Sequence, residues 1–291
     1  CFDPHHPFDP PADYFQRYQP EQMPLPRFQP GELANKPRYQ QLDHEWAHNE
    51  PGFFPVSKMT ATDQQEVTAA YYAMVELIDD QVGRILTALE ETGQRERTIV
   101  LFMSDHGEML GQHQWIRKRS GYEGSARIPF LLRFPESFGL AQGRQIEQVV
   151  ELMDVMPTVL DAANVDTPDT MDGNSVLPLL RDNVPEWRNY IHGECSPLET
   201  MNSGTQFITD GHLKYIYYPG PGEEQLFDLD IDPDEMYNVI NHPEYTKIAQ
   251  CQRDRLIGEL EGRPEEFVRD GVLVPLGGAT PPFLPKFERK E

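Results

Sequence analysis

The 291-residue sequence lacks several features that would assign it to a familiar class of protein. No stretch approaches the roughly 20 apolar residues of a membrane-spanning helix. Positive charge is scarce, because 25 Lys and Arg stand against 48 Asp and Glu, and a formal net charge of −23 argues against nucleic acid or an anionic membrane as a partner. The cysteines form no zinc-like or redox pair: Cys1, Cys195 and Cys251. Compartment and oligomeric state stay open.

What the sequence does have is enough apolar material for a core, with 38% hydrophobic residues. Residues 1–55 are rich in proline and aromatic side chains, which predicts an ordered but irregular wrapping segment rather than a disordered one. The start at Cys1 is neither a signal peptide nor a methionine start, so we expect the chain to be part of a longer one.

An amphipathic helix is predicted after this segment. Apolar residues recur there at spacings of 4, 3, 4, 4, 3 and 4: Val67, Tyr71, Met74, Ile78, Val82, Ile85 and Leu89. We expect Thr62 and Gln65 to form a capping box at its start and Gly93 to end it.

An unbroken apolar run at residues 99–103 follows, and it predicts a parallel strand buried on both faces. Ligands of open α/β sheets gather beyond the carboxyl ends of such strands. Asp105 and His106 lie at this point, and a carboxylate beside an imidazole favours a metal site over a merely polar strand end.

The remaining pattern predicts a second strand at residues 130–134 and a helix capped by Asp154. Asp210-Gly211 between two apolar runs indicates a β-hairpin over 206–218, followed by a strand at 226–229 and a helix within 244–261. The expected fold class is therefore α/β, with a small C-terminal antiparallel sheet and a helix. We place the domains at 1–188 and 189–291.

Cationic and imidazole side chains follow the predicted metal pair. Arg117, Lys118 and Arg119 form a basic cluster that is either a solvated patch or the binding site of an anionic substrate. His5 and His6 are either surface histidines or proton donors to a leaving oxygen.

Several ordered motifs together resemble the sulfatase family, within the alkaline-phosphatase-like superfamily. The first is the run 104–113, with Lys118 behind it. The others are the segment 122–129, the His-x-Pro-aromatic segment at 3–8, and the stretch 225–235 before the last predicted helix. The resemblance spans nearly the whole chain, and it implies a partial alkaline-phosphatase-like sheet flanked by helices.

The resemblance also implies residue roles. Asp105 and His106 would be two ligands of one divalent cation, usually Ca²⁺, with Mn²⁺ open because calcium prefers oxygen ligands. Lys118 and His5 match residues that contact the sulfate ester and assist the departing alcohol, with His6 as a weaker substitute for His5.

Four further residues belong to the same motifs. Tyr122, Glu123 and Arg127 match a supporting segment, in which we expect Glu123 and Arg127 to pair. His113 is interpreted as a surface histidine that alternatively borders the substrate pocket.

The family's nucleophile is a formylglycine made within a Cys/Ser-x-Pro-x-Arg motif, and no such motif occurs in the 291 residues. Cys195-Ser196-Pro197 comes nearest, but Glu199 stands where arginine is needed. We therefore expect the isolated chain to be inactive.

The predicted function is hydrolysis of a small sulfuric ester, either an aryl, a carbohydrate or a choline sulfate. One alternative is a phosphonate monoester or phosphodiester hydrolase of the same superfamily. The other is a non-catalytic half that keeps the fold without the chemistry.

Overall fold

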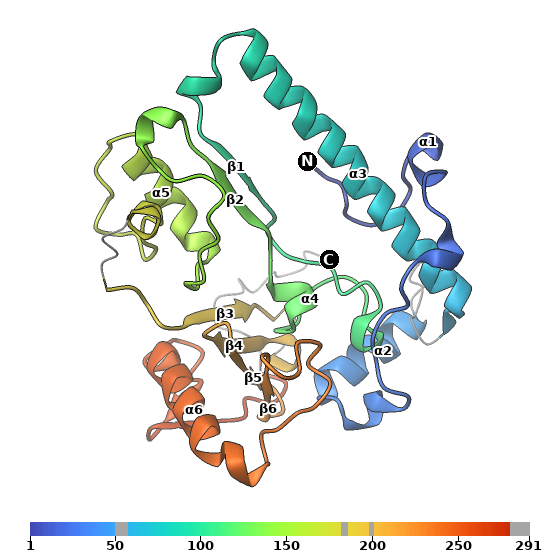
Figure 1. Cartoon of the computed structure of the whole chain (residues 1–291). Coiled ribbons are helices and arrows are strands. Elements are labelled where there is room, and N and C mark those ends of the chain that lie inside the picture. Colours follow the sequence, from blue (N-terminus) through green and yellow to red (C-terminus); the bar gives the residue numbers. More distant parts are fainter. Residues whose placement is uncertain (50–57, 182–185, 198–200, 280–291) are drawn as a thin grey trace, which may run out of the picture. The chain divides into compact units, whose positions relative to one another are not determined.

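The computed structural model describes residues 1–49, 58–181, 186–197 and 201–279 (Figure 1). These residues form an α/β structure that divides into two compact units. The first unit holds residues 1–36, 40–118 and 124–139, and the second holds 37–39, 119–123 and 140–291. The domain boundary expected at 188/189 stays a prediction. None of the described helices is long and apolar enough to cross a bilayer.

Helix α3 (Ala61–Glu91) is the predicted amphipathic helix, and it dominates the first unit (Figure 1). Its capping box is not the one expected from Thr62 and Gln65. Thr60 Oγ1 accepts the Asp63 N–H at 3.2 Å, and the Asp63 carboxylate accepts the Thr60 N–H at 2.7 Å. Thr60/Asp63 and Thr62/Gln65 both have the spacing of a capping box, and the helix begins at the first of these pairs. Gly93 follows the helix end with a left-handed φ of +67°, as predicted.

Strands β1 (Val100–Met103) and β2 (Phe130–Arg133) form the ribbon of the first unit. The prediction of a parallel strand buried on both faces was wrong, because β1 pairs antiparallel with β2. Phe102 is 37% exposed and Leu131 is 61% exposed. An apolar run has the same appearance whichever direction its partner takes, so the sequence pattern did not distinguish the two cases.

A groove runs along this ribbon within the first unit. It has a volume of about 670 Å³ and lies between α3 and β1, with mostly apolar walls that include Ile78, Val82, Leu101 and Met103. Ile85, also in the groove wall, is 59% exposed. The described residues of the first unit thus leave apolar surface uncovered.

The N-terminal segment is more regular than predicted. It contains α1 (Ala12–Phe15), two 3₁₀ turns (Pro20–Gln22 and Glu32–Asn35) and the twelve-residue helix α2 (Arg38–Asn49). Helix α2 begins directly after Pro37 and contains no proline, which explains why the helix-breaking composition of the preceding residues does not extend into it.

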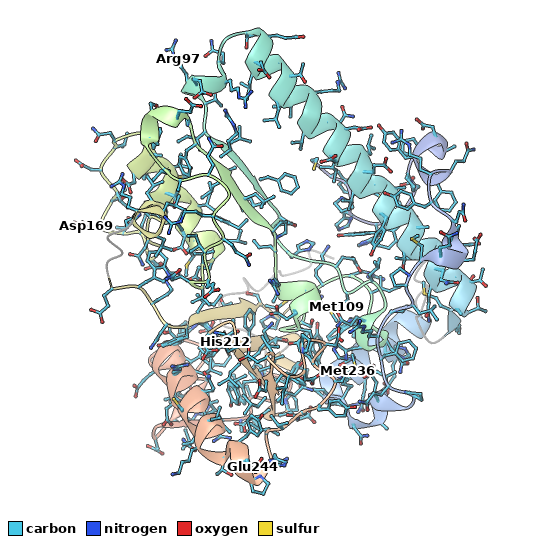
Figure 2. All side chains as sticks on the ribbon, in the orientation of Figure 1. Arg97, Met109, Asp169, His212, Met236 and Glu244 are labelled. Atoms are coloured by element: carbon cyan, nitrogen blue, oxygen red, sulfur yellow. The ribbon has the colours of Figure 1, made fainter. Side chains whose placement is uncertain are left out.

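The second unit is built on a four-stranded antiparallel sheet with the order β3-β4-β5-β6. Its strands are β3 (Ile191–Cys195), β4 (Thr205–Thr209), β5 (Leu213–Tyr218) and β6 (Glu223–Asp228). Helix α6 (Thr246–Leu260) packs on this sheet, and side chains crowd the space between them (Figure 2). The predicted hairpin, third strand and helix are all confirmed.

The core of the second unit is fully closed to solvent. Its buried members come from the sheet, α6 and the following chain: Ile208, Tyr215, Tyr217, Leu226, Ala249, Leu256, Leu260 and Phe267. Shorter elements complete the described structure: α4 (Glu123–Ala126), α5 (Val155–Ala162), β7 (Val268–Arg269) and β8 (Val272–Leu273).

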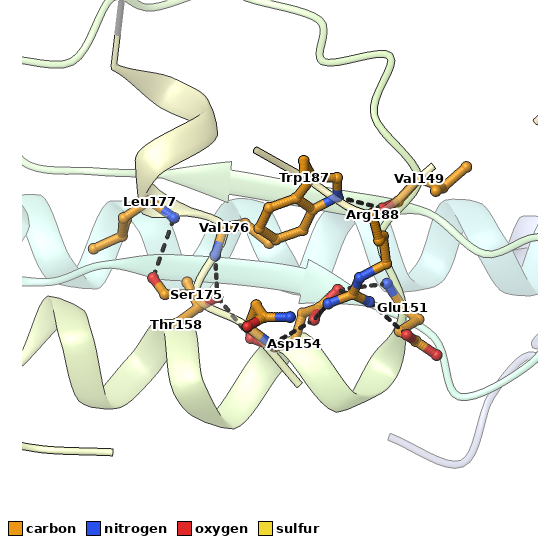
Figure 3. Close-up of polar contacts among 10 residues, drawn as sticks. Val149, Glu151, Asp154, Thr158, Ser175, Val176, Leu177, Trp187 and Arg188 are labelled. Carbon is orange, nitrogen blue, oxygen red and sulfur yellow. Dashed lines mark hydrogen bonds and ion pairs between the residues drawn. The ribbon is translucent and has the colours of Figure 1, made fainter. Parts of the chain in front are cut away.

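Asp154 organises the start of α5 (Figure 3). Its fully buried carboxylate accepts N–H groups from Glu151 at 2.9 Å and Asn174 at 2.8 Å, and pairs with Arg188 at 2.5 Å. Asp154 stands at the predicted N-cap position, but its side chain does not cap α5 itself. It joins three segments instead.

Candidate functional site

Asp105 and His106 lie just beyond the end of β1 in the first unit. His106 Nδ1 lies 2.8 Å from the Gly107 carbonyl oxygen, so Nδ1 carries the proton and Nε2 keeps a free lone pair. That nitrogen lies 3.6 Å from Asp105 Oδ2. The Asp105 side chain is 82% exposed. The pair thus presents two metal-type donors side by side.

Gly107 explains why the turn after this pair is tight. A Cβ at Gly107 would collide with the carbonyl oxygen of Gly124, and the Gly107 N–H donates to Ser125 O at 2.8 Å. Only glycine tolerates so close a backbone approach. The turn is thereby fixed against α4.

The donor set suits a hard divalent cation only in part. Among the described residues, no three His, Cys, Asp or Glu side chains gather closely enough to hold a metal ion. The tautomer of His106 and the adjacent carboxylate fit two positions of a coordination shell. The other positions need donors besides this pair.

Lys118 and His5 meet in the first unit, although 113 residues separate them, with Lys118 Nζ 2.8 Å from His5 Nε2. His5 Nδ1 lies 2.7 Å from the His6 carbonyl oxygen and donates to it, so Nε2 accepts from the Lys118 ammonium. The structure therefore joins the two residues predicted to assist a leaving group.

His6 stacks on His5, with ring centroids 4.0 Å apart. Burial, followed by the nearby His5, Arg117 and Lys118, lowers the pKa of His6 to about 4. His6 is therefore a neutral imidazole at physiological pH.

A pocket of about 890 Å³ opens beside these residues, within the first unit. His6 and Arg117, the sequence neighbours of His5 and Lys118, both line it. Its other walls are largely apolar and include Phe8, Phe15, Met59, Val67 and Ile116. The apolar walls and the volume of the pocket suit an organic group that lies beside His5 and Lys118.

Glu108 is a partly buried acid that the sequence reasoning did not single out. Burial raises the pKa of its carboxyl, while two backbone N–H groups and the electrostatic influence of nearby Lys118 and His106 act in the opposite direction. Glu108 is therefore close enough to sense both the Lys118–His5 pair and the Asp105–His106 pair. Its position directly after a His-Gly turn was the available signal.

His113 is fully buried, so its interpretation as a surface histidine was wrong. Its Nδ1 lies 3.0 Å from Lys36 Nζ and 3.5 Å from Glu32 Oε2. Gln40 Nε2 donates to the His113 carbonyl oxygen at 2.7 Å. These contacts fasten the loop before Lys118 to the N-terminal segment. A substrate contact of His113 stays a prediction.

Tyr122 and Glu123 belong to the second unit and are anchored there. Tyr122 is fully buried, and its hydroxyl donates to Gln225 Oε1 at 3.1 Å. The Glu123 carboxylate pairs with the fully buried Lys214, and its N–H donates to Glu235 Oε2 at 2.6 Å. The expected pair of Glu123 with Arg127 stays a prediction. Sequence reasoning missed Lys214 and Glu235, which lie 91 and 112 residues away from Glu123.

Two family models match the chain. The model described as Sulfatase matches residues 2–165, and the model described as N-sulphoglucosamine sulphohydrolase, C-terminal, matches residues 111–261.

Curated relatives carry arylsulfatase names. An Arylsulfatase of Clostridium perfringens is 40% identical over 272 residues, which cover 93% of this chain and 54% of that protein. Arylsulfatase K of Homo sapiens is 36% identical over 203 residues, covering 65% of this chain and 36% of its own length. The chain thus spans about half the length of the first of these relatives and less of the second.

Solved structures of the same fold match most of the chain. The phosphonate monoester hydrolase of Agrobacterium radiobacter gives a TM-score of 0.78 at 27% identity, covering 88% of this chain and 54% of its own. A protein solved with its substrate D-glucosamine-2-N,6-O-disulfate gives a TM-score of 0.72 at 21% identity, covering 89% of this chain and 63% of its own. This likeness shows the fold alone.

Proposed function

The chain belongs to the sulfatase family, and from that premise we propose that it supplies the leaving-group side of a sulfuric ester hydrolase. The 2.8 Å contact between Lys118 and His5 carries the proposal. Both residues stand next to residues that line a pocket large enough for an alcohol group.

Lys118 and His5 would act as a proton-holding pair. An ammonium that donates to a neutral imidazole places a positive charge and a mobile proton at one point. Negative charge that develops on the ester oxygen during S–O cleavage would be neutralised there. The tautomer of His5, fixed by the His6 carbonyl oxygen, keeps Nε2 directed toward Lys118.

We propose Asp105 and His106 as two ligands of a divalent cation. A bound cation would supply charge stabilisation to the sulfate oxygens. Ca²⁺ is the first expectation from the family, and the imidazole donor keeps Mn²⁺ as the alternative. A formylglycine nucleophile would come from residues outside these 291, because they contain no Cys/Ser-x-Pro-x-Arg motif.

The cation proposal can be tested on this chain by calorimetric titration with Ca²⁺ and Mn²⁺. Wild type should bind one ion weakly, and Asp105→Asn should lower the affinity by at least about tenfold. Asp172→Asn, at a carboxylate outside the site, is the matched control. Equal binding by wild type and Asp105→Asn would remove the assignment.

The pocket beside His6 is the proposed site of the alcohol part of the ester. In an active enzyme that contains this chain, Phe15→Ala should raise KM several-fold with little change in kcat, because it removes contact made equally in ground and transition states. Phe138→Ala, outside the pocket, should leave both parameters unchanged. A fall in kcat alone would place Phe15 elsewhere in the mechanism.

The function itself is tested by replacing Lys118. In the same enzyme Lys118→Ala should lower kcat by about 10²–10⁴-fold on esters of poorly acidic alcohols and much less on 4-nitrophenyl sulfate, whose leaving group needs no proton. An equal effect on both esters would contradict the leaving-group role.

One observation favours a second candidate, hydrolysis of phosphonate monoesters. Two phosphonate monoester hydrolases give TM-scores of 0.78 and 0.77, above the 0.72 of the disulfated-glucosamine complex. Rates on sulfate and phosphonate esters, each with Ca²⁺ and Mn²⁺, separate the two activities. A clear preference for phosphonates would replace the sulfatase proposal.

The leading proposal and the non-catalytic alternative share one prediction for the isolated chain. We expect the 291 residues alone to show no metal-dependent turnover of 4-nitrophenyl sulfate. Turnover above the metal-only rate would show that these residues suffice for chemistry.

A further inference from the structure

The loop immediately before Lys118 has an unusual backbone. Four of its side-chain-bearing residues have left-handed φ values between +47° and +78°: Leu110, His113, Gln114 and Arg117. Arg119, directly after Lys118, has a φ of +86°. This region of φ is disfavoured for residues with a Cβ, so the surroundings must hold the loop in its conformation.

Glu108 joins the two ends of that loop. One carboxylate oxygen, Oε1, accepts the N–H of Leu110 at 3.1 Å and also the N–H of Arg117. Beside it the Met109 N–H donates to the Arg117 carbonyl oxygen at 2.7 Å. The carboxylate thus closes the loop one residue before Lys118.

We propose that Glu108 is a positioning residue for Lys118, acting through the backbone of Arg117. The proposal rests on the proposed role of Lys118 as leaving-group acid. Glu108 also lies two residues after His106, so the loop that it closes begins beside the candidate metal pair and ends next to the lysine.

The contacts indicate that the length of the Glu108 side chain, rather than its charge, is what closes the loop. The oxygen that closes the loop is engaged by two backbone donors, and the chain needs an acceptor at that point to satisfy both. Glutamine places a carbonyl oxygen at the same distance from the backbone, whereas aspartate keeps the charge but is shorter by one methylene.

This difference gives a sharp test on the 291-residue chain, with Glu108→Gln compared with Glu108→Asp. Selective ¹⁵N labelling of histidine reads the chemical shift of His5 Nε2, the nitrogen that accepts from Lys118, and its signals are assigned with His5→Asn. Hydrogen exchange reads the Arg117 amide. Glu91→Gln and Glu91→Asp, at an exposed position near the end of α3, are the matched controls.

We expect Glu108→Gln to keep the wild-type His5 Nε2 shift and to change Arg117 exchange by less than about threefold. Glu108→Asp should move the Nε2 shift toward that of an imidazole nitrogen without a donor and speed Arg117 exchange by about 10- to 100-fold, as for a lost charge-assisted hydrogen bond. If Asp preserves both signals while Gln loses them, charge is the relevant property and the proposal is wrong. Unchanged signals in both variants also overturn it.

The signals report the Lys118–His5 contact without turnover, so they are independent of the proposed reaction. A loss of the His5 signature in Glu108→Asp, together with an enzyme indifferent to Lys118→Ala, would retain the positioning role and reject the proposed function. An unchanged His5 signature in Glu108→Asp, together with an enzyme that loses activity in Lys118→Ala, would reject only the role of Glu108.

Discussion

The β3–β6 sheet and the β1–β2 ribbon bury their strands to very different extents. In the sheet of the second unit, five consecutive residues of β5 are buried, and Tyr215 and Ile216 are completely inaccessible. In the ribbon no residue of either strand is buried, and Leu131 is 61% exposed. The sheet meets its own packing needs with α6, whereas the described part of the ribbon does not.

Polar groups follow the same division. The second unit places Lys214 with Glu123 and Glu235 in a cluster where Lys214 and Glu235 are fully buried, a costly arrangement unless the charges are paired. In the first unit the Asp105–His106 and Lys118–His5 pairs keep more solvent contact. The candidate chemistry thus lies in the more exposed pairs of the first unit, which also holds the buried contacts of Glu32 with Lys36 and His113.

Among substitutions that test this difference between the two units, Lys214→Met is expected to have the largest effect on stability. It leaves two carboxylates without their buried cation and should lower the free energy of unfolding by about 3–5 kcal/mol. Denaturant unfolding monitored by circular dichroism measures the change. Lys247→Met, at an exposed position on α6, should cost less than about 0.5 kcal/mol. A cost below about 1 kcal/mol for Lys214→Met would show that the cluster is not essential to the second unit.

A pair of leucine substitutions sharpens the contrast in packing. Leu256→Ala removes a side chain with no exposure from the core under the sheet and should cost about 2–5 kcal/mol. Leu131→Ala, on the exposed ribbon, should change stability by no more than about 0.5 kcal/mol in this chain. Equal costs in the same unfolding assay would mean that the ribbon is covered in solution.

The smallest effect expected is a pH dependence that originates in the first unit. An unfolded histidine takes up a proton below about pH 6.5, whereas folded His6 resists protonation down to about pH 4. Stability contributed by neutral His6 should therefore fall as the pH drops from 6.5 to 4 and should change no further below that. We expect about 1 kcal/mol after allowance for solvent exposure.

His6→Gln provides the comparison, since it removes this titration and leaves the other acids in place. Urea midpoints at pH 7, 5.5 and 4.5 should differ less in His6→Gln than in wild type. Parallel midpoints in the two proteins would mean that His6 titrates normally in the folded state.

Local periodicity made several elements predictable from the sequence. The spacing in α3 and the Asp210-Gly211 turn depend on neighbours a few residues apart, and both predictions are confirmed. The pairing direction of β1 depends on a partner about 30 residues on, and it was predicted wrongly. Helix α2 was missed because the composition of the preceding residues masked it.

The candidate site shows the same limit. His5 and Lys118 were found as separate motif positions, and the structure shows that they touch. Glu108 and Lys36, which hold the loop before Lys118, were missed because each depends on a loop closure or on a partner far along the chain. Lys214 of the second unit was missed for the same reason. Charged side chains in such supports look like ordinary surface residues in the sequence.

The passage of residues 119–123 into the second unit has a consequence for protein synthesis. A ribosome delivers Tyr122 and Glu123 well before Gln225, Lys214 and Glu235, so the second unit cannot assemble until the later residues have emerged. Expression of residues 140–291 alone would leave the Lys214 cluster without Glu123. A useful truncation of this protein therefore has to begin upstream of Tyr122, however self-contained the C-terminal sheet looks.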